Sequence, residues 1–167
     1  MVVKGQPARS RITIAIEVPC AALAGEADLE RVVAHTLAAE GVATPVAITV
    51  VVVDDATIHR LNRQYLQHDE PTDVITFPLG DDAGDPFVRP ASGACRELGE
   101  IYVSCERAAA QSAEWGSDPE REVRFLVAHG VLHLLGWDDA TPDQRARMLA
   151  RQEELLAGWV PVGPGSR

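Results

Sequence analysis

The stretch FLVAHGVLHLLGWDD, residues 125–139, carries the pattern that decides the fold. Its helical part is entirely apolar or glycine except for His129 and His133. A helix that is apolar on nearly all sides belongs in a protein core, so we expect a buried helix over residues 119–136. Gly130 costs about 1 kcal/mol relative to alanine in mid-helix, which predicts that another backbone packs closely there.

Two histidines at positions i and i+4 lie one above the other on a single helix face. Unpaired imidazoles would each cost about 1–3 kcal/mol in an apolar interior. Gly136 can end the helix in a left-handed turn and bring a following carboxylate back toward the histidines. We therefore interpret His129, His133 and Asp139 as the ligands of one Zn²⁺ per chain, with a fourth position open for a catalytic water.

Working outward from this helix, short β-branched or apolar runs predict four strands, and periodic or buried stretches predict five helices. The strands are expected at 12–18, 46–53, 73–79 and 98–104, and the helices at 28–40, 55–67, 104–115, 119–136 and 142–157. The order of these elements is typical of an α+β domain with a mixed four-stranded sheet and segregated helices. The metal site then lies on the buried fourth helix and the turn that follows it.

Individual residues refine this outline. The nearly continuous apolar run 46–53 predicts a strand covered on both faces, and Pro78 marks its own strand as an edge or an ending strand. Asp28 is expected to cap the first helix. Residues 98–104 should form a hairpin-like pair with the preceding strand.

Residues 1–167 are expected to form one domain, since this length suits a single hydrophobic core. We expect residues 1–10 and 160–167 to be flexible ends. The segment 80–97 is rich in Gly, Asp and Pro and predicts a long loop.

Composition restricts the function classes. Fifteen Lys and Arg against 25 Asp and Glu give a formal charge of −10, which argues against a broad phosphate-binding surface but permits a compact metal site. The chain has three cysteines and no C-x-x-C spacing, so we expect no disulfide framework and a reducing compartment. The apolar run at 12–16 is too short for a signal peptide, and no segment reaches the ~20 apolar residues of a membrane helix. A cytoplasmic protein without membrane contact is expected.

The zinc-peptidase motif H-E-x-x-H is the nearest general pattern, and its Glu serves as the general base. Gly130 stands at that position here. Glu122 lies two turns earlier on roughly the same face, about 10 Å away, which is far for that role. A zincin-type peptidase is therefore the weakest of the hypotheses kept open.

The residues together resemble the YbeY family of metal-dependent endoribonucleases. HGVLHLLGWDD (129–139) is similar to the family signature H-G-x-L-H-L-x-G-Y-D-H. LNRQYLQHDEPTDVITFP (61–78) and LGEIYVSCERA (98–108) resemble two further family segments, L-N-x-x-Y-R-x-x-D-x-P-T-D-V-L-S-F-P and L-G-D-I-x-I-x-x-x-x-A.

The resemblance implies an α+β fold with zinc on the buried helix and a nuclease that selects single-stranded RNA. It further implies a role in ribosomal RNA processing, especially maturation of the 16S 3′ end, and in ribosome quality control. The implied partners are ribosomal RNA, the small ribosomal subunit and its assembly factors. In this picture a metal-activated water attacks an RNA phosphodiester, and no other catalytic group is assigned.

Two positions depart from the family pattern. Asp139 replaces the family's third histidine, with Asp138 as a competing carboxylate, and Leu66 replaces an arginine. An anionic ligand leaves the metal less electrophilic, and an aliphatic side chain cannot neutralise a phosphate. Arg63 and His68 lie near Leu66 in sequence and are candidates to compensate, although each also suits an ordinary helix surface.

Three further residues lie in family motifs. Thr72 and Asp73 belong to the P-T-D turn, where they either line the cleft or hold backbone N–H groups. Trp137 stands in the family's Tyr position and is expected to pack against the metal turn. The departures at residues 66 and 139 also motivate an alternative from another class, a ribosome-assembly factor with a structural metal and little nuclease activity.

Overall fold

The computed structural model describes residues 9–20, 25–70, 72–79 and 95–161. They form one four-stranded sheet in the order β1-β2-β4-β3, with five helices. The strands are β1 (Arg11–Ile16), β2 (Val46–Val53), β3 (Val74–Pro78) and β4 (Arg96–Ser104), and the helices are α1 (Glu26–Ala39), α2 (Asp55–Leu66), α3 (Cys105–Trp115), α4 (Pro119–Leu134) and α5 (Pro142–Leu156). The α+β class and the mixed sheet are confirmed, with each element within about two residues of its expected position.

Strands β1, β2 and β4 run parallel, and β3 pairs with β4 in the antiparallel direction. β3 is therefore an edge strand that pairs with the next strand along the chain, as expected. Most of the predicted loop 80–97 and of the predicted flexible ends lies outside the described residues. The loop prediction was too long at its end, because Arg96 and Glu97 already pair with β2 as the first residues of β4.

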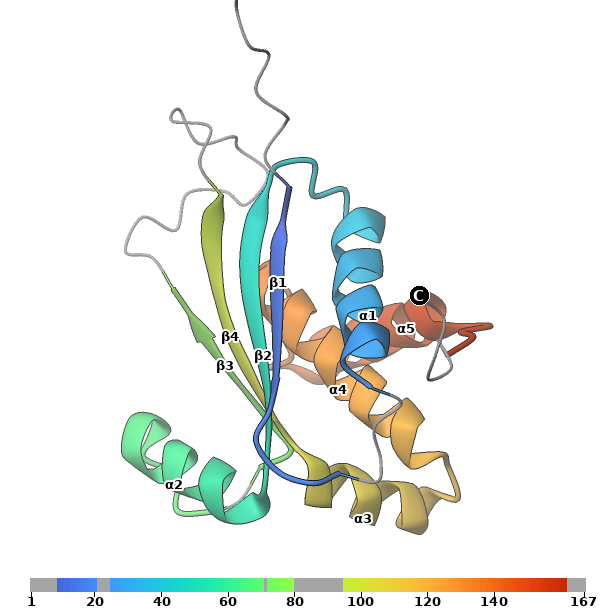
Figure 1. Cartoon of the computed structure of the whole chain (residues 1–167). Coiled ribbons are helices and arrows are strands. Elements are labelled where there is room, and N and C mark those ends of the chain that lie inside the picture. The colour runs from blue at the N-terminus through green and yellow to red at the C-terminus, as the bar shows by residue number, and fades with distance from the viewer. Residues whose placement is uncertain (1–8, 21–24, 71, 80–94, 162–167) are drawn as a thin grey trace, which may run out of the picture.

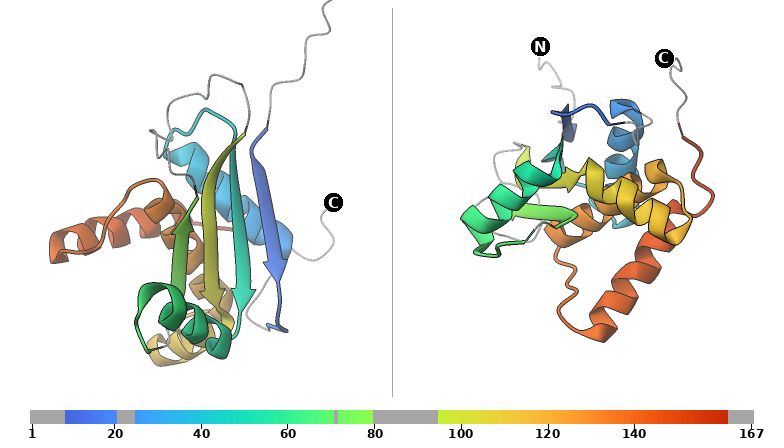
Figure 2. Two further views of the ribbon diagram at one scale, coloured as in Figure 1. Left: turned by 90° about the vertical axis from the view of Figure 1, so that its left-hand side faces the viewer. Right: turned by 90° about the horizontal axis from the view of Figure 1, so that it is seen from below.

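The helices divide unequally between the two faces of the sheet (Figures 1 and 2). α1 packs on β1, and α4 lies across β3 and β4 with α5 on its outer side. α2 covers part of the opposite face through a smaller cluster around Ile58 and Ile75. Seven of the eight residues of β2 are buried, as predicted for a strand covered on both faces. This packing makes α4 the central element between the sheet and α5.

Gly130 lies at a close contact between α4 and the sheet. A Cβ atom built there would lie 2.5 Å from Cγ2 of Ile101, a fully buried residue of β4. The neighbour is a side chain, so the prediction of a close backbone was wrong. Because a methyl group has no room at this position, the glycine sets how closely α4 approaches the sheet.

Asp28 does not cap α1, which begins two residues earlier, after Gly25. Its carboxylate is buried and accepts a hydrogen bond from Nη1 of Arg124 at 3.0 Å and another from Nε1 of Trp159 at 3.2 Å. The expectation failed because the sequence cannot show a partner 96 positions away. The pair instead ties α1 to α4.

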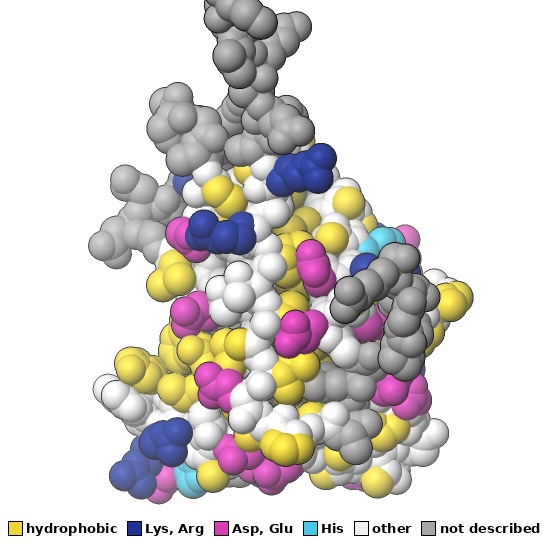
Figure 3. Space-filling model, viewed as in Figure 1, with side chains coloured by type: hydrophobic (Ala, Val, Ile, Leu, Met, Phe, Trp, Pro, Cys, Tyr) yellow, Lys and Arg dark blue, Asp and Glu magenta, His cyan; other side chains and the backbone are white. Residues whose placement is uncertain are grey.

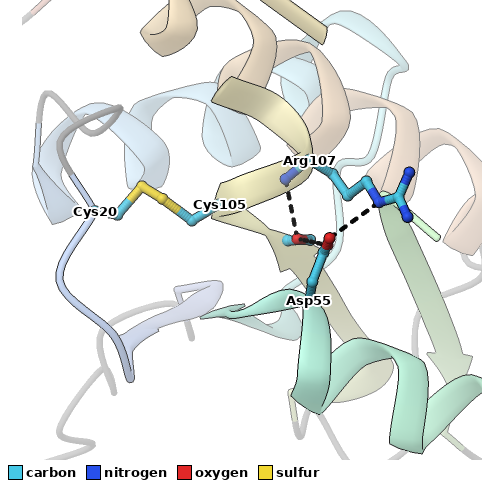
Figure 4. Close-up of a disulfide and its surroundings, with 5 residues drawn as sticks. Cys20, Asp55, Cys105 and Arg107 are labelled. Carbon is cyan, nitrogen blue, oxygen red and sulfur yellow. Dashed lines mark hydrogen bonds and ion pairs between the residues drawn. A yellow bond between two sulfur atoms is a disulfide. The ribbon is translucent and has the colours of Figure 1, made fainter. Parts of the chain in front are cut away.

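Cys20 and Cys105 form a disulfide (Figure 4), so the expectation of no disulfide framework was wrong at this pair, and the cysteine pattern no longer supports a reducing compartment. They are 85 positions apart, but Cys20 follows β1 and Cys105 follows β4, and the carboxyl ends of parallel strands meet at one edge of the sheet. At the same edge, Asp55 at the start of α2 accepts a hydrogen bond from Oγ of Ser104 and pairs with Arg107 (Figure 4). Cys95 is free.

Within the described residues, no helix has the length and apolar character needed to cross a membrane.

We predict that Gly130→Ala destabilises the fold. Alanine improves helix propensity by about 1 kcal/mol, but forcing its methyl group against Ile101 should cost more, about 1–3 kcal/mol. Urea denaturation measures the change in free energy of unfolding.

The matched comparison is Gly130→Ala in an Ile101→Ala background. The Ile101→Ala substitution by itself lowers the free energy of unfolding by about 2–5 kcal/mol. There the methyl group has room, so Gly130→Ala should become neutral or stabilising. A single Gly130→Ala variant more stable than the parent chain would contradict this account of the α4–sheet contact.

Candidate metal centre

α4 presents His129 and His133 at the β3 edge of the sheet, and the turn after α4 brings Asp139 beside them. Nε2 of His129 lies 3.0 Å from Nε2 of His133, and each lies 3.5 Å from Oδ2 of Asp139. Among the described residues this is the one group of three His, Cys, Asp or Glu whose ligand atoms lie close enough to hold a metal ion. The side chains are 21%, 24% and 39% exposed, so solvent reaches the group.

The protonation of both imidazoles follows from their outer partners. Nδ1 of His133 lies 3.0 Å from the carbonyl oxygen of Trp137, which only accepts, so Nδ1 carries the proton. Nδ1 of His129 lies 3.0 Å from Oε1 of Gln152, whose amide nitrogen donates to the carbonyl of Phe125 and thereby fixes the amide orientation. In the neutral rings both Nε2 atoms are therefore lone-pair acceptors.

Two lone pairs and a carboxylate oxygen converge on one point, and an arrangement of three acceptors is repulsive unless a cation lies between them. Ligand atoms 2.0–2.2 Å from a tetrahedral ion are roughly 3.3–3.6 Å apart, close to the observed separations. Hydrogen bonds from the outer imidazole nitrogens to an amide and a carbonyl are also typical of metal-binding histidines. The residues present therefore fit a divalent ion such as zinc.

Burial lowers the pKa of His129, and the adjacent His133 acts in the same direction. The hydrogen bond with Gln152 and the carboxylates of Asp139 and Asp73 act in the opposite direction without reversing the shift. The lowered pKa favours the neutral imidazole, which is the form that binds a metal.

The turn after α4 has the predicted left-handed glycine, since φ of Gly136 is +99°. Asp138 accepts hydrogen bonds from the backbone N–H groups of Asp139 and Ala140, so its carboxylate holds the turn and Asp139 faces the histidines. Trp137 packs against the cluster of Leu132, Met148 and Leu155, and its indole N–H donates to Glu40 at the end of α1.

Four residues outside the cluster were considered for substrate contact, and two of them, Thr72 and Asp73, lie beside the cluster. Thr72 and Asp73 line a cleft together with His129, His133 and Asp139. Asp73 also holds structure, because its Oδ2 accepts a hydrogen bond from Gln111 and its carbonyl accepts one from the backbone of Ser104. Asp73 therefore lines the cleft and also links the start of β3 to α3 and to the end of β4.

The other two candidates lie elsewhere. Arg63 lines a hollow on α2 with His59 and Arg60, where basic side chains gather at the lower left of Figure 3. His68 follows the end of α2, and its backbone N–H donates to the carbonyl of Asn62. Neither lines a cavity that contains the cluster. Leu66 does line the cleft and is 45% exposed.

Glu122 is buried at the far end of a second cavity that also reaches His129. Its Oε1 accepts a hydrogen bond from Oγ of Ser117 at 2.7 Å and lies 3.6 Å from Nη1 of Arg121. The carboxylate thus has partners at the start of α4, away from the three ligand atoms, which disfavours the peptidase hypothesis.

Sequence reasoning missed two residues of α5. Gln152 holds His129, and Nη1 of Arg145 donates to the carbonyl of Asp139 at 3.3 Å. For Gln152 a signal exists, since it occupies the buried helical stripe between Met148 and Leu155 where an apolar residue is expected. Arg145 carries no comparable signal.

Comparisons with known proteins agree on one family. The sequence model described as "Endoribonuclease YbeY" matches residues 16–160. Among curated relatives, the "Endoribonuclease YbeY" of Roseiflexus castenholzii is 50% identical over 129 residues, covering 77% of this chain and 79% of the relative. That of Roseiflexus sp. is 47% identical over 150 residues, covering 88% and 92%. The solution structure of TM1509 from Thermotoga maritima matches with a TM-score of 0.57 and 27% identity, covering 93% of this chain and 99% of that one.

We predict that Gln152→Met lowers metal affinity about 10–100-fold, because it removes the acceptor that orients His129 while keeping a side chain of similar length. Competition with a chromogenic chelator measures the affinity. Gln64→Met, on the exposed face of α2, is the control and should change nothing. Equal affinities in the two variants would show that the amide does not support the site.

Proposed function

Since the chain belongs to the YbeY endoribonuclease family, we propose that it is a zinc-dependent endoribonuclease that cleaves single-stranded RNA. The observation that carries the proposal is the convergence of His129, His133 and Asp139 at the rim of a cleft. Two nitrogen ligands and one oxygen ligand with an accessible side suit a catalytic zinc site better than a closed structural one.

The chain's own residues supply orientation and electrostatics. A divalent ion bound here supplies Lewis acidity toward a water molecule and a phosphoryl oxygen. Gln152 and the carbonyl of Trp137 fix both imidazole rings, so the ligands need no reorganisation during the reaction. Thr72 and Asp73 form the cleft wall on the β3 side.

We further propose that the RNA is ribosomal, that the activity serves 16S 3′-end maturation and ribosome quality control in the cytoplasm, and that the small subunit and its assembly factors are partners. The charge of −10 supports this, because an acidic protein binds free RNA weakly and depends on local contacts and on partners for orientation.

One observation favours a second candidate, an assembly factor whose metal is structural. Leu66 lines the cleft and offers no charge to a phosphate. This candidate predicts co-sedimentation with small-subunit particles and no turnover of single-stranded RNA.

We predict that His133→Ala loses metal and RNA cleavage together. Metal analysis of the purified protein and cleavage of a labelled single-stranded RNA are measured on the same preparation. The control is His59→Ala, which removes an exposed imidazole that also contacts a carboxylate, Asp69, but lies on α2. Cleavage that survives both His133→Ala and a chelator would refute the metal-dependent mechanism.

We predict that Asp139→His retains the metal and changes the rate. A neutral third ligand leaves the ion more electrophilic, so the midpoint of the pH–rate profile should move to lower pH. If Asp139→His leaves both the profile and the metal content as in the parent chain, Asp139 is not a ligand.

A further inference from the structure

A second cavity adjoins the candidate metal centre and shares Asp73, Val74, His129 and Asp139 with the β3 cleft. It has a volume of about 250 Å³ and lies between α3, α4 and α5, which Figure 2 shows together from below. His129 and Asp139 line one end. Its walls are mostly apolar and include Trp115, Phe125 and Leu149.

Two large apolar side chains that line this cavity are exposed to solvent. Trp115 at the end of α3 is 63% exposed, and Leu149 on α5 is 53% exposed. Both are among the few large hydrophobic side chains left in solvent within the described residues, and both line the same cavity. Exposed apolar side chains gathered around one cavity indicate a binding site.

Arg145 supplies the charge that an RNA strand requires. Among the described residues that line either cavity containing His129 and Asp139, it is the only Lys or Arg. One of its nitrogens donates to the carbonyl of Asp139, which holds the guanidinium beside the cluster, and the side chain is exposed. The neighbouring charged groups, Asp73, Glu122 and Asp139, are acidic, so a phosphate has no other cationic partner on these walls.

We propose that this cavity binds one nucleotide of the substrate strand, with its base stacked on Trp115 and its phosphate paired with Arg145. The proposal rests on the proposed nuclease function and adds where the strand lies. The cavity is smaller than the roughly 300–1,000 Å³ of pockets that hold drug-sized ligands, so it suits a single base. An aromatic side chain and a cationic side chain that line one site are the usual combination for sequence-tolerant binding of single strands.

This subsite adjoins the cluster, because Nη1 of Arg145 donates to the backbone carbonyl of Asp139, a proposed ligand residue, at 3.3 Å. Because the two cavities share His129 and Asp139, a strand held in the second cavity can extend past these residues into the β3 cleft. Arg145 on α5 thereby supplies the cationic contact that the family pattern places at residue 66, where this chain has Leu.

The test measures binding of a short single-stranded RNA to the zinc-loaded full chain by fluorescence anisotropy at several salt concentrations, alongside cleavage. Trp115→Ala should weaken binding about 5–150-fold, the range expected for loss of one base stack. Arg145→Ala should weaken binding and reduce the slope of log K against log salt by about one, whereas Arg145→Lys should keep the slope.

Two matched controls lie outside the cavity. Arg147→Ala removes an exposed arginine two positions along the same helix, and Tyr65→Ala removes an aromatic side chain of similar exposure on α2. Both should bind RNA like the parent chain. Circular dichroism checks that each variant is folded.

The outcomes separate this subsite from the proposed function. If the parent chain binds RNA without cleaving it, and Trp115→Ala and Arg145→Ala lose binding, the subsite stands and the nuclease proposal fails. If the parent chain cleaves RNA and the two variants bind like the controls, the subsite is overturned. Failure of the parent chain to bind RNA at low salt also overturns the subsite. So does the result that Trp115→Ala and Arg145→Ala bind RNA like the parent chain but lose binding to a ribosomal protein.

Discussion

Two imidazole rings in the otherwise apolar second half of α4, residues 125–134, are the constraint on which the remaining structure depends. α4 must be buried to satisfy its apolar faces, yet His129 and His133 need polar partners and access to solvent. The chain meets both demands by placing α4 beside the edge strand β3, so that one helix face enters the core and the other reaches the rim of the sheet. Gly130 permits the close approach to β4 that this position requires.

The outer shell of the site ties distant parts of the chain together. Gln152 brings α5 to His129, and Glu40 at the end of α1 accepts hydrogen bonds from the indole of Trp137 and from Arg151 on α5. The same turn that presents Asp139 is thereby fixed by two helices. Buried polar groups that all have partners make the local structure rigid, which is the condition for precise ligand placement.

Local patterns were sufficient for the elements and for the cluster of ligand candidates. The spacing of His129 and His133 and the left-handed Gly136 act within one or two helical turns, so their geometry follows from the sequence alone. Contacts between distant positions were not accessible in this way. The ion pair of Asp28 with Arg124, the Cys20–Cys105 disulfide and the role of Gln152 each depend on packing that brings residues together from different elements.

The negative net charge of the chain limits how it can bind RNA. A charge of −10 repels a polyanion at long range, so we expect the affinity of the two cavities at the cluster for RNA to come from short-range terms: metal coordination, base stacking and Arg145, the one Lys or Arg among their described lining residues. Arg145 is held beside Asp139 by a neutral carbonyl and not by a carboxylate, so its charge stays available to a ligand. If RNA binds only through the contacts proposed at this cleft, an acidic chain is suited to act where a partner presents the strand to it.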